Sequence, residues 1–67
     1  MRTYLKEIGA KVRKAREAKG LRLRDLGVIC KLDYSNICRF EQGSQDIKLS
    51  TLKNLADALD KDVKDFL

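Results

Sequence analysis

Apolar residues recur at helical spacing in the first part of the chain. Intervals of three or four residues separate Leu5, Ile8, Val12 and Ala15. Thr3 precedes this stripe as a candidate N-cap, and Gly20 follows it as a residue that stops helices. The pattern predicts an amphipathic helix that opens after Thr3 and closes at Gly20.

Two shorter helices are expected next, separated by a break near residues 31–33. The first runs from about Leu23 to Cys30, with Leu26 and either Cys30 or Ile29 facing inward. The second runs over residues 34–42, capped by Asp33 and ended by Gly43. At about 100° per residue, its apolar face carries Ile37 and Phe40. Its polar face carries Tyr34, Ser35, Cys38, Arg39 and Gln42.

The last part of the chain predicts a fourth helix and a final helical turn. Ser50 is the candidate N-cap of the fourth helix, whose inward stripe is Leu52, Leu55, Ala56 and Leu59. Asp62 is placed to cap a last turn that carries Val63, Phe66 and Leu67. Pro is absent and the four glycines are dispersed, so no linker or repeat divides the chain. Residues 1–67 are therefore expected to form one all-α domain, a compact bundle of five short helices.

The composition argues against several classes of function. A chain of 67 residues with 43% hydrophobic residues can fold, but it leaves little room for a catalytic cleft, so we expect no enzyme. The absence of His excludes an imidazole base and a His-ligated metal, and no cofactor is expected. Cys30 and Cys38 are interpreted as packing or surface residues, with a redox or metal role as the less favoured alternative.

Positive charge is concentrated at the start of the chain. The net charge is +5, and residues 1–24 hold nine basic and two acidic residues, a net +7, whereas the remainder carries −2. Such an imbalance indicates a polyanionic partner. Neither a signal-peptide h-region nor an apolar run near the roughly 18 residues of a membrane helix is present, so we expect a cytoplasmic protein without a membrane partner.

The 23 residues from Leu21 to Gly43 resemble the Cro/C1-type helix-turn-helix family of phage repressors and small bacterial regulators. Leu26 and Gly27 match the leucine and the small residue of its second helix. Its third-helix pattern is matched by Ile37, Arg39, Phe40, Glu41, Gln42 and Gly43. The similarity extends from about Lys6 to Leu67 and implies a lambda-repressor-like fold, with the helix-turn-helix at the second and third helices. It also implies double-stranded DNA as the partner.

The resemblance and the helical wheel together give the expected site residues. Base reading in the major groove is expected from Tyr34, Ser35, Cys38 and Arg39. Phosphate contacts are expected from Arg22, Arg24, Asn36, Gln42, Ser44 and Lys48. In the family, residues at the places of Arg16 and Glu41 form a structural ion pair. A homodimer on an inverted repeat is implied, with Val63, Phe66 and Leu67 as its expected interface. The protein is therefore expected to be a small transcriptional regulator that acts as a repressor.

Three departures from the family pattern keep a second function open. Leu23 replaces a glutamine that binds phosphate, and Lys31 replaces a glycine favoured in the turn. Val28 and Ile29 occupy positions that are usually polar, and they give the second helix an extra apolar edge. The alternative function is a protein-interaction module with the same fold, such as an antitoxin that binds a partner protein.

Overall fold

Four α-helices and one 3₁₀ turn follow one another along residues 3–67, the part of the chain that the computed structural model describes. They are α1 (Thr3–Ala18), α2 (Leu23–Cys30), α3 (Tyr34–Gln42), α4 (Leu49–Ala58) and η1 (Val63–Phe66). None of the helices in this range is long and apolar enough to cross a membrane. The all-α prediction is therefore confirmed for the described residues.

The bounds of α2 and α3 agree with the sequence prediction, whereas the last two elements differ from it. The predicted fifth helix is wrong, because residues 63–66 form a single 3₁₀ turn. The carboxylate of Asp65 accepts the backbone N–H of Asp62 at 3.0 Å and so holds this turn at its start. Ser50 is not an N-cap, because α4 already begins at Leu49 and the first helical hydrogen bond runs from the Leu52 N–H to the Lys48 carbonyl, at 2.9 Å.

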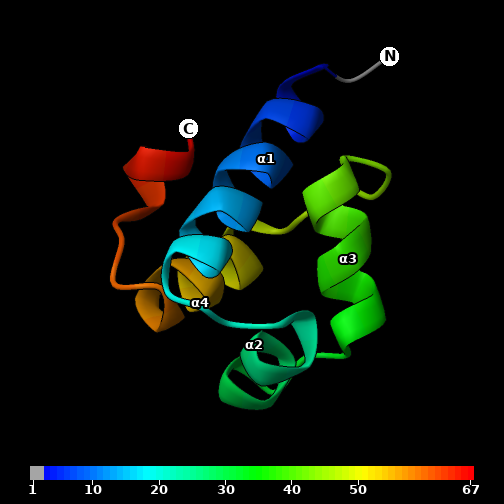
Figure 1. The fold of residues 1–67 in the computed structure, drawn as a ribbon. Coiled ribbons are helices and arrows are strands. Elements are labelled where there is room, and N and C mark those ends of the chain that lie inside the picture. Colours follow the sequence, from blue (N-terminus) through cyan, green and yellow to red (C-terminus); the bar gives the residue numbers. More distant parts are fainter. Residues whose placement is uncertain (1–2) are drawn as a thin grey trace.

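The hydrophobic core is built from side chains of all four helices and of η1. α1 packs mainly against α3, α2 packs against both α3 and α4, and η1 closes the core against α1 and α4. Figure 1 shows α3 beside α1, with the C-terminal turn on the opposite side of α1. The largest side chains that are fully buried are Phe66, Leu26, Ile37, Leu52, Leu55, Leu59 and Val12. The apolar stripes predicted for α1, α3 and α4 thus face the core, although Ile8 is only partly buried.

The structure resolves the alternative that the pattern of α2 left open. Cys30 is 4% exposed and belongs to the core, whereas Ile29 is 53% exposed. The Cys30 thiol donates to the carbonyl of Asn54 at 3.9 Å, and burial raises the pKa of this thiol. Cys30 and Cys38 are both free. Cys30 therefore packs as a small apolar residue.

The turn between α2 and α3 keeps a left-handed residue without glycine. Lys31 has a φ of 57° and a ψ of 43°. The chain then returns so closely over α2 that the Leu32 N–H donates to the Gly27 carbonyl at 2.9 Å. A Cβ at Gly27 would lie 2.8 Å from the Leu32 carbonyl oxygen, so a side chain there would collide with the turn. This close return fixes where α3 begins.

Candidate nucleic-acid interface

The N-terminus of α3 is fixed by its cap. The Asp33 carboxylate accepts hydrogen bonds from both the backbone N–H and the hydroxyl of Ser35, each at 3.0 Å. These two hydrogen bonds lower the pKa of the Asp33 carboxyl below its ordinary value. The Ser35 hydroxyl therefore supports the cap, and its oxygen still has lone pairs that can accept a bond from a base.

Arg39 lies on the exposed face of α3, opposite the buried Ile37 and Phe40. One of its terminal nitrogens, Nη1, donates to Oδ1 of Asn36 at 3.0 Å. Asn36 lies one turn earlier on α3 and is half-buried. This hydrogen bond limits the motion of the guanidinium and leaves most of its donors available to an external acceptor.

Two further expected contacts lie at the end of α3. Cys38 is half-buried and lines a shallow hollow together with Leu23 and Gln42. The Ser44 hydroxyl donates to the Arg39 carbonyl at 3.3 Å, so it closes the C-terminus of α3. Gln42, by contrast, is exposed on the last turn and has a free side-chain amide within the described hydrogen-bond network.

The start of α2 already carries an anionic group. The Asp25 carboxylate accepts the backbone N–H of Arg22 at 2.9 Å and lies 3.8 Å from the Arg22 side-chain Nε. The Arg22 side chain is 91% exposed. The backbone donors at this helix end are therefore partly satisfied within the protein, which makes the site less receptive to phosphate than an uncapped N-terminus.

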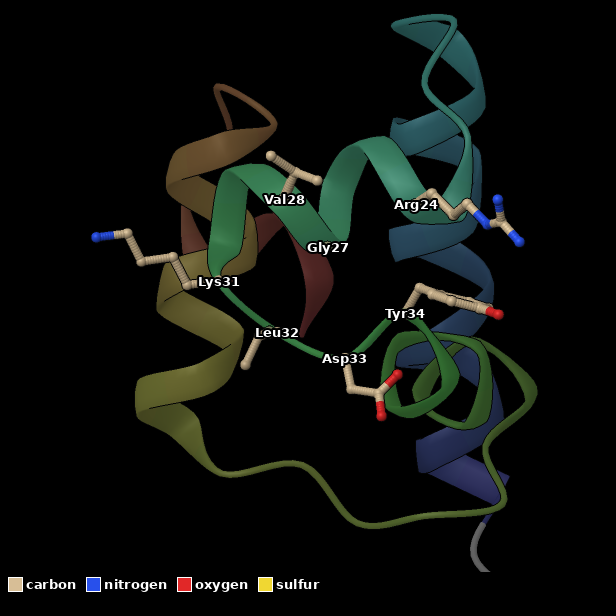
Figure 2. A pocket seen from close by; sticks show the side chains of 7 residues that line it. All are labelled: Arg24, Gly27, Val28, Lys31, Leu32, Asp33 and Tyr34. Atoms are coloured by element: carbon tan, nitrogen blue, oxygen red, sulfur yellow. The ribbon is translucent and has the colours of Figure 1, made fainter.

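Arg24 and Tyr34 meet across the gap between α2 and α3. The guanidinium carbon of Arg24 lies 5.3 Å from the centroid of the Tyr34 ring, within the range of a cation–π contact. Figure 2 shows the two side chains next to each other, pointing to the same side of the molecule, while Val28 points away from Tyr34. The sequence pattern placed each residue in the interface separately and did not indicate this contact.

Arg16 and Glu41 form an ion pair beneath this surface. The Nε and Nη2 of Arg16 donate to the two carboxylate oxygens of Glu41 at 2.7 and 3.1 Å. Nη1 of Arg16 donates to the Leu21 carbonyl at 2.8 Å. The hydrogen bond to Glu41 raises the pKa of the Arg16 guanidinium above its ordinary value. The two side chains are only 10% and 6% exposed, and they tie α1 to α3.

The residues expected at a dimer interface do not share one environment. Phe66 is 2% exposed and belongs to the core, so its placement at an exposed interface is wrong: its ring fills the space between η1, α1 and α4. Leu67 is 67% exposed and Val63 is half-buried. Leu49, which the sequence analysis did not select, is 66% exposed and lines an apolar hollow with Val63. Leu49 is an apolar residue just before the inward stripe predicted for α4, and this position outside the stripe could have indicated its exposure.

The remaining phosphate candidate, Lys48, is exposed immediately before α4. It lies at the end of the loop that joins α3 to α4, the same loop that contains Ser44. The exposed surfaces of α3 and of the start of α2 thus bring most of the expected residues together. We call this surface the candidate interface, and it comprises Arg22, Arg24, Tyr34, Ser35, Asn36, Cys38, Arg39 and Gln42.

The chain is similar to known regulators over nearly its whole length. The helix-turn-helix domain family matches residues 7–65. The structure is similar to that of the restriction-modification controller protein C.AhdI from Aeromonas hydrophila, with 32% identity and a TM-score of 0.90 over 94% of this chain and 96% of that chain. It is also similar to the clp gene regulator ClgR from Corynebacterium glutamicum, with 28% identity and a TM-score of 0.86 over 92% of this chain and 67% of that chain.

More distant similarity concerns the fold alone. An HTH_3 family transcriptional regulator from Vibrio cholerae has 19% identity and a TM-score of 0.88, over 96% of this chain and 36% of that chain. Among curated proteins, no sequence matches the chain.

Proposed function

Because the chain belongs to the helix-turn-helix domain family, of the Cro/C1 type, we propose that it binds double-stranded DNA sequence-specifically as a small transcriptional repressor in the cytoplasm. The proposal rests mainly on the exposed face of α3. Arg39 lies on this face, and its guanidinium donates a hydrogen bond to Asn36. A helix of this size fits the major groove of B-DNA. The similarity to a controller protein and to a gene regulator supports a regulatory role. The protein acts without catalysing a reaction.

Within this proposal, α3 reads bases and the elements around it contact the backbone. Arg39 pairs with O6 and N7 of guanine, the commonest specific contact of arginine in the major groove. Tyr34, Ser35 and Cys38 contact neighbouring base edges from the same face. Gln42, Lys48 and the exposed Arg22 contact phosphates, and the net charge of +5 favours the approach to DNA.

The proposed assembly is a homodimer on an inverted repeat. One recognition helix reads few base pairs, and two helices about 34–36 Å apart would reach successive major grooves. Val63 and Leu67 remain interface candidates, and Leu49 joins them because it is exposed beside Val63. Phe66 supports this surface from inside the core.

The proposed function is tested by in vitro selection of the purified protein on a random duplex library at near-physiological salt. We expect an inverted repeat whose half-sites lie about one helical turn apart. Salt-sensitive retention without any enriched motif would contradict the proposal.

Substitution of two exposed arginines separates base reading from phosphate binding. We expect Arg39→Ala to lower the preference of the protein for its operator over random DNA by about tenfold, because a bidentate pair with guanine is worth roughly 1–3 kcal/mol. Arg22→Ala should weaken binding to all duplexes by a similar factor and reduce the salt dependence. Fluorescence anisotropy with operator and random duplexes measures both effects. Equal losses of preference in the two variants would refute this division of roles.

A second candidate function is the binding of a partner protein, such as a toxin, through α2. The observation that favours it is the apolar edge of Val28 and Ile29, which are 79% and 53% exposed. Contiguous exposed apolar residues often mark an interaction surface. Under this alternative, the selection on random duplexes would recover no motif.

The apolar edge also gives a prediction for the favoured function. Val28 points away from Tyr34 and so from the proposed reading surface (Figure 2). We therefore expect the double variant Val28→Ser, Ile29→Ser to stay folded, because exposed substitutions change the free energy of unfolding by under about 0.5 kcal/mol, and to bind the selected operator within about twofold of the wild type. Titration of the labelled operator measures this affinity. A much larger loss would show that the edge takes part in DNA binding.

A further inference from the structure

The contact between Arg24 and Tyr34 differs from the environment of the other arginines at the interface. Arg39 donates to Asn36 on its own helix, and Arg22 lies beside Asp25. Arg24 instead packs its guanidinium on the Tyr34 ring at 5.3 Å, and no carboxylate or carbonyl acceptor is paired with it within residues 3–67. All five of its N–H donors are therefore available to a ligand.

The ring of Tyr34 restricts where this guanidinium can lie. A guanidinium held over an aromatic face by a cation–π contact has fewer positions available to it than a free one, and its N–H donors remain exposed. Tyr34 is the first residue of α3, so the guanidinium of Arg24 is held beside the first turn of the helix that is proposed to enter the major groove. Two shallow hollows lie next to this pair, one of them lined also by Gly27 and the other by Asp25. Arg24 and Tyr34 line both hollows, so together they form the ridge between them. A ridge of this kind is suited to entering a groove.

The chemistry of the two side chains points to bases rather than to phosphate. The planar edge of guanidinium N–H donors matches O6 and N7 of guanine, and an exposed aromatic ring makes apolar contact with the methyl group of thymine.

We propose that Arg24 and Tyr34 act as one unit that reads a guanine next to a thymine in each half-site, in addition to the base read by Arg39. Arg24 is the specificity-determining residue of this unit, and Tyr34 positions it and contacts the thymine. Arg24 is thereby moved from the phosphate contacts to the base readers. The inference rests on the proposed function, since it requires that α3 enters the major groove of DNA.

The test measures the affinities of four proteins for the selected operator and for all its single-base-pair variants. The proteins are the wild type, Arg24→Lys, Tyr34→Leu and the double variant. Arg24→Lys keeps the charge and removes the planar donor edge, so we expect about a tenfold loss of discrimination at one guanine position per half-site, with an unchanged dependence on salt. Tyr34→Leu should lower discrimination at the same guanine and its neighbouring thymine. The double variant should lose no more at the guanine than Arg24→Lys alone.

The matched control is Arg13→Lys, because Arg13 lies on α1 outside the candidate interface, its side chain is 63% exposed and its charge partner is Glu17 on the same helix. We expect this variant to keep the base preferences of the wild type at every position. Urea unfolding of each variant verifies that it is folded at the concentration used for binding.

The outcomes separate the inference from the proposed function. If Arg24→Lys loses affinity equally for the operator and for every base-pair variant, Arg24 is a phosphate contact. This result would overturn the inference, while the proposed function would stand. Additive losses in the double variant would refute the coupling of Arg24 to Tyr34. The absence of any operator for the wild type would overturn both proposals.

Discussion

Removal of the Glu41 carboxylate should lower the free energy of unfolding by about 3–5 kcal/mol, because it leaves the Arg16 guanidinium buried without its counter-ion. Both side chains are nearly inaccessible to solvent, and two short hydrogen bonds join them across α1 and α3. Small domains have total stabilities of roughly 5–15 kcal/mol, so this loss is a large fraction of the whole. We expect Glu41→Ala to shift the urea unfolding midpoint strongly, or to leave the protein partly unfolded without denaturant.

The chain provides a matched control on its surface. Arg13 and Glu17 form an ion pair of 3.2 Å on α1, with side chains that are 63% and 53% exposed. Because water screens such a pair and competes for it, Glu17→Ala should cost less than about 0.5 kcal/mol in the same urea titration. Similar losses for Glu17→Ala and Glu41→Ala would mean that burial of the Arg16–Glu41 pair has no special effect.

The second large effect is expected at Gly9, where α1 makes its closest approach to α3. A Cβ at Gly9 would collide with the carbonyl oxygen of Phe40 and would lie 2.6 Å from that of Glu41. These are backbone atoms of the last turn of α3, so they cannot rotate away as a flexible side chain would. We expect Gly9→Ala to lower the free energy of unfolding by about 3 kcal/mol, although alanine favours helix more than glycine does.

The comparison for this prediction is Gly20→Ala. Gly20 has a φ of 71°, but a Cβ there would meet no atom within 4 Å. Its substitution therefore adds backbone strain of roughly 1 kcal/mol without a collision. Thermal and urea unfolding should therefore show a larger loss of stability for Gly9→Ala than for Gly20→Ala. A stability of Gly9→Ala equal to that of the wild type would show that α1 and α3 can separate without cost.

Both predictions concern the contact that holds α3 in place. Gly9 lets α1 approach the end of α3, and the Arg16–Glu41 pair joins the same two helices. α3 is only nine residues long, and helices of this length are not stable alone in water. The proposed reading surface therefore depends on α1, although α1 contributes none of its base-reading residues.

The sequence by itself determined the bounds of α2 and α3 and the main core positions. Asp33 and Gly43 cap the two ends of α3 through backbone groups within a few residues. The bounds of this helix can therefore be predicted without knowledge of the fold. The apolar stripes are local in the same sense, because a helix brings residues three and four apart onto one face. The resemblance to the Cro/C1-type family supplied the Arg16–Glu41 pairing, which no local pattern specifies.

Only the tertiary structure decided which apolar residues remain exposed and which polar ones meet. Cys30 rather than Ile29 enters the core, and Phe66 fills the core instead of an interface. The contact of Arg24 with Tyr34 and the close approach of α1 to α3 at Gly9 likewise depend on how separate helices pack against one another. Capping and periodicity act over one or two turns of helix, whereas these contacts join distant residues and depend on the joint packing of all helices around the core.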